Sequence, residues 1–346
     1  MPNDVLTRAI DAASSGTHLT ADHASAVLEE IMSGRAGEVQ TGAFLIALRT
    51  KGETVAELVG LARTMRGLAA EVDPSRPDLV DTAGTGGGPS TFNISTAAAL
   101  VAAGAGCSVA KHGNRSSTSR SGSADLLEAL GVTIDLGPDQ VARCIDELGF
   151  GFMFAPRHHA AMKHVVPVRK ELAVRTIFNF LGPLTNPAGA TRQLLGVSDP
   201  AYQEVIAEAL LGLGCERAMV VRSADGIDEI STTAETRVVE VEDGGTREWF
   251  LRPDEIGVAL TDVNQIAGGS PAENAATVTA VLAGEEGPAR EVVVLNAAAA
   301  ILVGGGTDDL LGAIEMAREA IDSGAARDVL ARLVDLTGGL ASGSTA

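Results

Sequence analysis

The spacing of apolar residues over the first 72 positions predicts a bundle of short helices. Apolar residues recur at three- and four-residue intervals in four successive stretches, which is the period of one helix face. The second stretch follows a candidate N-cap at Thr20, and Thr54-Val55-Ala56-Glu57 is a capping box that begins the fourth. Because a small bundle commonly buries a remaining apolar face in a second subunit, we expect a homodimer formed through these helices.

The pattern changes after Pro74 and Pro77, where short apolar runs begin to alternate with helical stretches. This spacing is typical of βαβ units, so we predict an α/β protein with a mostly parallel sheet flanked by helices. We assign a small helical domain to residues 1–72, joined by part of 158–190, and a larger α/β domain to 73–346. The predicted strands are 79–81, 108–111, 132–134, 150–155 and 217–222, followed by an antiparallel pair at 238–241 and 248–251. The predicted C-terminal helices are 272–282, 297–303 and 308–323, with more helix after them.

Composition supports helix-on-sheet layers and limits the partners. Apolar residues make up 45% of the chain but aromatics only 3%, so the core must consist of small aliphatic side chains packed among 40 glycines. The formal charge of −19 disfavours a nucleic-acid or anionic-membrane surface. Three cysteines without a C-x-x-C motif suit a reducing compartment, and we find neither a signal-peptide pattern nor an apolar span. We therefore expect a cytoplasmic protein with no membrane partner.

One stretch has an unusual balance of charge. Between Asp81 and Asp125 lie 43 residues without a carboxylate, in a chain where 45 acids outnumber 26 bases. The same interval holds Lys111, Arg115 and Arg120, two glycine-rich turns and many hydroxyl side chains. Cations, hydroxyls and exposed backbone N–H groups bind phosphate, so this segment predicts a site for a phosphorylated ligand.

Two loops carry this prediction. The turn Gly84-Thr85-Gly86-Gly87-Gly88 follows a predicted strand and precedes a helix, although a plain tight turn would look the same. It matches neither the G-x-G-x-x-G fingerprint nor the phosphate loop with Gly-Lys-Ser/Thr. The sequence Lys111-His112-Gly113-Asn114-Arg115 follows the next strand. Parallel strands end at one edge of a sheet, so we expect both loops to share a cleft there.

These motifs resemble anthranilate phosphoribosyltransferases, which act in tryptophan biosynthesis. The resemblance rests on D-T-x-G-T-G-G, T-F-N-I-S-T-A-A-A and K-H-G-N-R-S, and continues through V-R-K-E-L, R-T-I-F-N, G-P-L-T-N-P-A and D-G-I-D-E-I-S. The order and spacing of the motifs cover nearly the whole chain. The resemblance implies transfer of the phosphoribosyl group of phosphoribosyl pyrophosphate to the amine of anthranilate, with Mg²⁺ on the pyrophosphate. It also implies a homodimer.

The resemblance assigns roles by position. The residues that match phosphoribosyl pyrophosphate contacts are Gly84, Gly87, Gly88, Thr91, Asn93, Ile94, Ser95, Thr96, Lys111, His112, Gly113, Asn114, Arg115, Ser116, Ser117, Thr118, Ser119 and Ser123. Those that match the anthranilate site or its channel are Gly84, Asn114, Pro156, His159, Met162 and Arg169. The residues that match Mg²⁺ positions are Ser95, Asp228 and Glu229.

The chemistry of these residue types suits the roles. Hard oxygen ligands suit Mg²⁺, although an Asp-Glu pair is more often an ordinary acidic turn. Arg169 can bind a carboxylate through two parallel hydrogen bonds, and the stretch from Leu148 to Ser198 contains a single acid, Glu171. The reacting aniline nitrogen is weakly basic, so positioning can matter more than a general base. We assign no proton acceptor; His112 and His159 are candidates, and a packing role fits each equally well.

Two departures from the family pattern weaken the prediction of acceptor choice. The family usually has Asp after G-T-G-G and one further residue in that loop, whereas this chain has Gly88-Pro89-Ser90. The family's H-P-A-M is His159-Ala160-Ala161-Met162 here. Two alternatives remain open: a pyrimidine nucleoside phosphorylase, which shares the Ser-Gly-Ser-Ala-Asp region, and a non-catalytic relative that binds nucleic acid in the same cleft.

Overall fold

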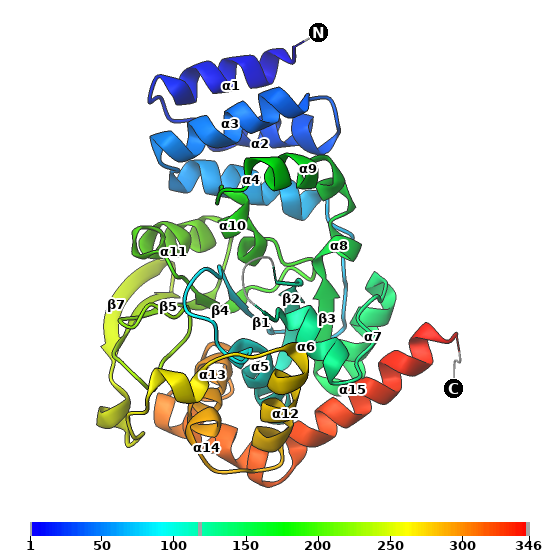
Figure 1. The fold of residues 1–346 in the computed structure, drawn as a ribbon, viewed down its shortest axis with the longest axis vertical. Coiled ribbons are helices and arrows are strands. Elements are labelled where there is room, and N and C mark those ends of the chain that lie inside the picture. The colour runs from blue at the N-terminus through cyan, green and yellow to red at the C-terminus, as the bar shows by residue number, and fades with distance from the viewer. Residues whose placement is uncertain (1, 117–119, 344–346) are drawn as a thin grey trace.

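A helical bundle lies at one end of the molecule and a seven-stranded sheet lies beneath it, with α12–α15 at the far end (Figure 1). The computed structural model describes residues 2–116 and 120–343. Its architecture is the predicted one, an α/β protein with a small N-terminal bundle and a mostly parallel sheet flanked by helices. The bundle consists of α1 (Asp4–Ser14), α2 (Ala21–Met32), α3 (Glu38–Lys51) and α4 (Val55–Gly67).

Local sequence signals determine the ends of the bundle helices. The Thr20 side chain caps α2 at the N–H of His23, as predicted. The predicted capping box of α4 forms in full, with the Thr54 hydroxyl accepting from the N–H of Glu57 and the Glu57 carboxylate accepting from the N–H of Thr54. Each helix turns its apolar stripe inward, which accounts for four elements at the places where the pattern predicted them.

Glu57 is also the buried electrostatic centre of the bundle. Its carboxylate is fully buried and accepts from the Leu19 N–H, from Thr54 and from the Lys51 ammonium, which is 2.9 Å away. Burial alone would raise the pKa of Glu57, but these hydrogen bonds favour the charged form more strongly and lower the pKa. The carboxylate is therefore ionised in the folded state.

We expect Glu57→Gln to lower the free energy of unfolding by roughly 3 kcal/mol, because it leaves the buried Lys51 ammonium unpaired. Glu29→Gln, on the exposed side of α2, is the matched control and should change little. Since the folded-state pKa of Glu57 lies below the unfolded one, its stabilisation is complete above the unfolded value, about 4.3, and is lost as the pH falls further. Urea unfolding at pH 7 and pH 3 measures the free energy of unfolding of both proteins. If the difference between wild type and Glu57→Gln is as large at pH 3 as at pH 7, the assignment is contradicted.

The sheet has the order β3-β2-β1-β4-β5-β6-β7, with β3 through β5 parallel and the last two strands antiparallel. The chain adds β2 and β3 on one side of β1 and then returns to place β4 on the other. Such a reversal of strand order creates a crevice at the carboxyl ends of the strands, where α/β proteins bind ligands. The strands are β1 (Leu79–Gly84), β2 (Ser108–Gly113), β3 (Phe150–Phe154), β4 (Arg192–Gly196), β5 (Arg217–Ser223), β6 (Thr236–Glu242) and β7 (Gly245–Leu251).

Both faces of the sheet are buried, and alternate residues of one strand show this. On β5, Met219 and Val221 belong to the core beneath α5 and α13, whereas Ala218 and Val220 belong to a second core that includes α11 and the bundle. That second core also takes in Val168 of α9, which packs against α3. The remaining helices are α5 (Ile94–Gly104), α6 (Ser123–Ala129), α7 (Pro138–Leu148), α8 (Ala155–His158), α9 (Val166–Leu172), α10 (Phe178–Leu181), α11 (Gln203–Gly212), α12 (Pro271–Leu282), α13 (Pro288–Val303), α14 (Leu310–Asp322) and α15 (Ala325–Ala341), with 3-10 turns at Ala160–His164, Gly182–Leu184, Pro200–Tyr202, Pro253–Ile256 and Val263–Ile266.

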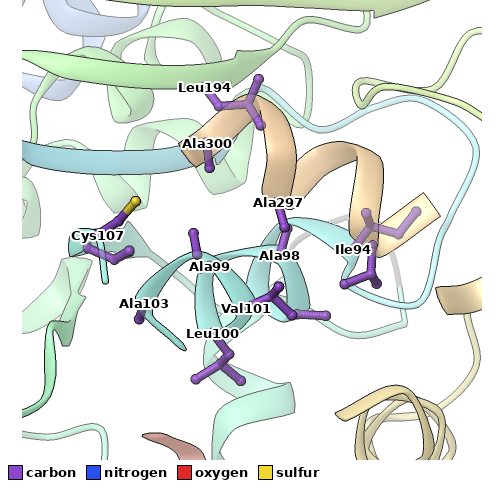
Figure 2. Packing of buried hydrophobic residues seen from close by; sticks show 14 of the residues in the cluster. Ile94, Ala98, Ala99, Leu100, Val101, Ala103, Cys107, Leu194, Ala297 and Ala300 are labelled. Atoms are coloured by element: carbon purple, nitrogen blue, oxygen red, sulfur yellow. The ribbon is translucent and has the colours of Figure 1, made fainter. Parts of the chain in front are cut away.

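Small side chains allow α5 and α13 to pack closely. Figure 2 shows Ala98 and Ala99 of α5 facing Ala297 and Ala300 of α13, all fully buried. Alanine methyl groups keep the two helix backbones near each other where larger side chains would hold them apart. This packing is possible because the chain is rich in small aliphatic side chains and poor in aromatic ones.

Two sequence predictions of secondary structure were wrong, and one strand was missed. Residues Val132–Ile134 form no strand, because Val132 and Ile134 pack into the helical layer and the Thr133 N–H donates to the Thr337 hydroxyl of α15. The predicted helix at 297–303 is only the second half of α13. The central strand β4 was not predicted at all.

None of the helices in the described residues combines the length and the hydropathy that crossing a bilayer requires.

Candidate active site

The two predicted loops lie at the same edge of the sheet. Strands β1 and β2 are parallel neighbours, so the glycine turn after Gly84 and the loop after Gly113 both leave from carboxyl ends. The loop with Asp228 and Glu229, which follows β5, closes the same edge from the other side of β4. Elements that are far apart in the chain therefore meet at one edge of the sheet, as the sequence predicted for the first two.

The glycine turn lies directly against Asp228. A Cβ on Gly84 would lie 2.5 Å from Oδ2 of Asp228, and a Cβ on Gly88 would lie 2.5 Å from the carbonyl oxygen of Gly226. The N–H of Gly86, which has a φ of +62°, donates to the same Oδ2 at 2.8 Å. Gly84 and Gly88 therefore have no room for a side chain, and the positive φ of Gly86 favours glycine there.

Lys111 is the buried cation of the site. Its side chain is 2% exposed, and Nζ donates to the carbonyl oxygen of Thr82, to the Thr82 hydroxyl at 3.0 Å and to the Ser95 hydroxyl at 3.4 Å. Burial lowers the pKa of Lys111 to about 8, and the charges of Asp81 and Glu229 oppose that change. The ammonium therefore retains most of its charge at neutral pH and lies between Thr82 of β1 and Ser95 of α5.

The acidic pair is held by hydrogen bonds from the β1–α5 segment. Glu229 accepts from the Thr91 hydroxyl at 2.9 Å and from the Ser95 N–H at 3.3 Å. Desolvation and the neighbouring charge of Asp228 raise the pKa of Glu229 to about 8, against the opposing effects of these hydrogen bonds and of Lys111. Desolvation also raises the pKa of Asp228, while the N–H of Gly86 and the charge of Arg175 oppose it. The two acids are thus desolvated, and a nearby positive charge would be needed to keep both of them ionised.

These residues fit a Mg²⁺ ion that is shared with a phosphorylated ligand. Asp228, Glu229 and Ser95 offer hard oxygen atoms, and a divalent cation would favour the ionised form of both desolvated acids. The part of the chain that the structure describes contains no cluster of three or more His, Cys, Asp or Glu residues able to hold a metal. A Mg²⁺ here would therefore need ligand oxygens and water to complete its coordination shell.

Several predicted contact residues have side chains that are engaged elsewhere. The backbone of Asn93 is in the left-handed region (φ 66°). Its side-chain oxygen accepts hydrogen bonds from the Ser121 hydroxyl at 2.9 Å and from the Asn274 carboxamide of α12 at 2.8 Å. Ile94 and Thr96 are fully buried, so neither side chain is exposed to a ligand. Arg115 forms ion pairs with Asp125, at 3.0 Å, and with Glu128 on α6.

Small and exposed residues complete the second loop. A Cβ on Gly113 would lie 2.3 Å from the Ser123 hydroxyl, which itself donates to the carbonyl of Asn114 at 3.3 Å. Asn114 is exposed, and the N–H of Ser116 donates to Asp125 at 3.1 Å. The predicted contacts Ser117, Thr118 and Ser119 lie outside the described residues.

Four of the six residues predicted to contact anthranilate lie on the segment that returns to the bundle, and the other two, Gly84 and Asn114, lie on the two loops. Arg169, on α9, places its guanidinium over the ring of Phe178 at 5.6 Å; among the described residues it has no ion pair or side-chain hydrogen bond. Pro156 is exposed on α8, Met162 is partly buried in the turn before α9, and His159 is 3% exposed. Arg169 lies outside the hydrogen-bond network that joins Lys111 to the acidic pair.

The buried His112 of β2 lies against the buried His159. The rings of His112 and His159 have centroids 5.0 Å apart, and Nδ1 of His112 is 3.2 Å from the carbonyl oxygen of Gly182. Burial, together with the neighbouring histidines, lowers the pKa of His112 to about 3 and that of His159 to about 4. Both rings are therefore neutral at pH 7.

Three residues that support the site, namely Asp81, Thr82 and Asn186, were not predicted from the sequence. Asp81 is fully buried and accepts from Asn186 at 2.8 Å and from the His112 N–H at 3.1 Å, while Thr82 binds Lys111. Burial raises the pKa of Asp81 to about 6, with Lys111 opposing. The available signal was an Asp-Thr pair inside an apolar strand, where polar side chains require partners.

Comparison with known proteins identifies the family. Residues 7–69 match the helical bundle domain, and residues 76–327 the a/b domain, of a glycosyl transferase family. The chain is 52% identical to the anthranilate phosphoribosyltransferase of Symbiobacterium thermophilum, over 93% of this chain and 95% of that one. The chain belongs to the anthranilate phosphoribosyltransferase family.

Solved structures of the family have the same fold. The crystal structure of the anthranilate phosphoribosyltransferase of Thermus thermophilus superimposes with a TM-score of 0.89 at 44% identity, covering 95% of this chain and 99% of that one. That of Saccharomyces cerevisiae, in complex with PRPP (phosphoribosyl pyrophosphate) and Mg, has a TM-score of 0.88 at 28% identity, covering 96% and 98%.

The structure explains one departure from the pattern of anthranilate phosphoribosyltransferases. Gly88 lies so close to the Gly226 carbonyl that a side chain would collide with it, and Pro89 packs beside Gly226. The shorter loop is therefore fitted to the Asp228 loop. Ala160, the other departure, is exposed next to the buried His159, where nothing in the structure requires proline.

Proposed function

We propose that this chain transfers the phosphoribosyl group of phosphoribosyl pyrophosphate to anthranilate, with Mg²⁺, as a step of tryptophan biosynthesis. In this reaction the bond between the ribose C1 and the pyrophosphate oxygen breaks, a bond from C1 to the anthranilate nitrogen forms, and that nitrogen loses a proton. The observation that carries the proposal is the convergence of the glycine turn, Lys111 and the Asp228-Glu229 pair at one sheet edge.

The residues contribute by binding and orientation. Lys111 supplies positive charge where the pyrophosphate leaves, and the turn supplies N–H groups at the N-terminus of α5. Ser95, Asp228 and Glu229 would hold Mg²⁺, which neutralises the pyrophosphate when it is bound. Arg169 would bind the anthranilate carboxylate and so place the amine. The remaining assigned contacts of both substrates are part of the same proposal.

The direct test is turnover by the purified protein. With phosphoribosyl pyrophosphate, Mg²⁺ and anthranilate, anthranilate fluorescence should disappear as phosphoribosyl anthranilate and pyrophosphate form. Cleavage of thymidine with inorganic phosphate, without loss of anthranilate fluorescence, would instead indicate a nucleoside phosphorylase. Salt-dependent DNA binding without any turnover would indicate the nucleic-acid-binding relative.

We also propose a homodimer that forms through the bundle. Ile10 of α1 and Ala43, Ile46 and Ala47 of α3 line an apolar hollow of about 520 Å³, and Val39 on the same helix is 87% exposed. Exposed apolar faces of this kind are favourable to cover. Sedimentation equilibrium should give twice the chain mass of 35.2 kDa, and a monomer across micromolar concentrations would contradict the proposal.

Two further assignments remain proposals. One is the division into a helical domain of 1–72, joined by part of 158–190, and an α/β domain of 73–346; contacts of α9 with α3 support it. The other is a cytoplasmic location, which the three free cysteines suit, because thiols persist in reducing compartments.

A further inference from the structure

Arg175 reaches the glycine turn from the segment that returns to the bundle. It lies between α9 and α10, and the family resemblance gave it no role. Its Nη1 donates to the carbonyl oxygen of Gly86 at 3.0 Å, and Nη2 is 3.4 Å from the carbonyl oxygen of Thr85. One guanidinium thus holds two successive carbonyl groups of the turn, which its planar fork of donors can do.

The turn is shaped around this guanidinium. Gly87 has a φ of +98°, which favours glycine, and a Cβ there would lie 1.6 Å from Nη1 of Arg175, so a side chain at this position would displace the guanidinium. The Ser198 hydroxyl donates to the same Gly86 carbonyl at 2.7 Å. Two donors from different elements therefore fix the direction of that carbonyl.

Fixing a carbonyl also fixes the N–H on the other side of its peptide plane. The described peptide bonds are trans, so each N–H points opposite to the carbonyl it shares a plane with. In the peptide of Thr85 and Gly86, the carbonyl faces Arg175 while the N–H donates to Oδ2 of Asp228 at 2.8 Å. In the next peptide, the held carbonyl of Gly86 turns the N–H of Gly87 away from Arg175.

A stack of aromatic rings links Arg175 to the bundle. Its guanidinium lies over the Phe180 ring at 5.6 Å, and Phe180 stacks on Tyr202 with centroids 3.9 Å apart. The Tyr202 hydroxyl donates to the carboxylate of Glu53, which is buried between α3 and α4. Phe180 and Tyr202 thereby limit the positions the guanidinium can take.

We propose that Arg175 is a positioning residue for phosphoribosyl pyrophosphate and its Mg²⁺: by holding the carbonyls of Thr85 and Gly86, it orients Asp228 and the N–H of Gly87. Arg175 acts through the backbone and contacts neither the reacting carbon nor the acceptor. The inference rests on the proposed function and adds to it a link between the bundle and the phosphate turn.

The test measures binding as well as turnover. Isothermal titration of Arg175→Gln with phosphoribosyl pyrophosphate and Mg²⁺, without anthranilate, should give a Kd about 10-fold above wild type and a comparably higher Mg²⁺ requirement, in the range typical of residues behind a metal site. The KM for anthranilate should stay within about 2-fold, because Arg169 is untouched. Arg63→Gln, the same change at an exposed position of α4, should bind as wild type does.

Two further variants separate positioning from charge and from folding. Arg175→Lys keeps the charge but cannot bond both carbonyls, so it should restore less than half of the lost affinity; full restoration overturns the proposal. Ser198→Ala removes one donor from the Gly86 carbonyl and should weaken binding about 3-fold. If Arg175→Gln fails to fold, an unchanged Kd for Ser198→Ala overturns the proposal.

The outcomes also separate this inference from the function on which it rests. Wild-type protein that neither binds phosphoribosyl pyrophosphate nor turns over contradicts the proposed function. Active wild type together with an unchanged Kd and Mg²⁺ requirement for Arg175→Gln overturns the role of Arg175 alone. Equal loss of affinity for both substrates would mark a general structural effect and overturn it as well.

Discussion

Replacing Asp228 with Asn and Glu229 with Gln should lower kcat/KM by a factor of about 1000 at millimolar Mg²⁺. In the proposed function the two carboxylates would supply the negative charge for Mg²⁺, whereas amides offer only neutral oxygens. Titration of Mg²⁺ at fixed phosphoribosyl pyrophosphate should show a requirement at least about 10-fold higher. Steady-state kinetics over a range of Mg²⁺ concentrations measures both effects.

The same double variant should retain its stability without ligand. Desolvation raises the pKa of both acids, so their charged forms are unfavourable in the free protein and neutral amides relieve that cost. The Tm of the free double variant should therefore equal that of wild type or be slightly higher. The increase in Tm that phosphoribosyl pyrophosphate with Mg²⁺ gives to wild type should be absent in the variant. The matched control is the exposed pair Asp254→Asn with Glu255→Gln. An unchanged Mg²⁺ titration in the first variant would exclude these two residues as ligands.

The helical bundle could be predicted from the sequence because its determinants are local. The capping interactions of Thr20 and of Thr54 with Glu57 lie within single helix ends, and each apolar stripe has one period. The shared edge of β1 and β2 was also predictable, because parallel strands end on one side whatever the details of packing.

The central strand β4 shows where such prediction fails. It is only five residues long and begins with Arg192 and Gln193, so it has no run of apolar residues. Gln193 is nevertheless buried, and its carboxamide donates to the Pro183 carbonyl at 2.6 Å. Its polar group is satisfied by a preceding turn, and only the folded chain brings that turn alongside.

The sequence predicted the loops that form the site, but it did not predict the contacts between those loops. The approach of Gly84 to Asp228 spans 144 positions, and Arg175 meets Gly86 across 89. No periodicity encodes such pairs. Their only trace in the sequence is a glycine that the local backbone conformation does not require, as at Gly84, where a side chain would collide with Asp228.

Arg169→Ala should raise the KM for anthranilate about 10- to 100-fold and leave the KM for phosphoribosyl pyrophosphate within about 2-fold, as expected when a pair of charge-assisted hydrogen bonds is lost. The guanidinium of Arg169 is poorly solvated, and this burial lowers its pKa. Within the described chain it has no carboxylate partner, and an anionic ligand would supply one. Lys170→Ala, at the exposed neighbouring position, is the control and should leave both KM values unchanged.

Anthranilamide, which lacks the carboxylate, makes this test specific. If Arg169 binds that carboxylate, wild type and Arg169→Ala should bind anthranilamide with similar, weak affinity, and the difference between them should appear only with anthranilate. Arg169→Lys should recover little, because an ammonium cannot form two parallel hydrogen bonds. Equal losses for anthranilate and anthranilamide, or for anthranilate and phosphoribosyl pyrophosphate, would instead mean that Arg169 supports α9 through its packing on Phe178. The carboxylate would then have to be bound elsewhere, and Asn114 of the second loop, which is exposed and was predicted to contact anthranilate, would be the next residue to replace.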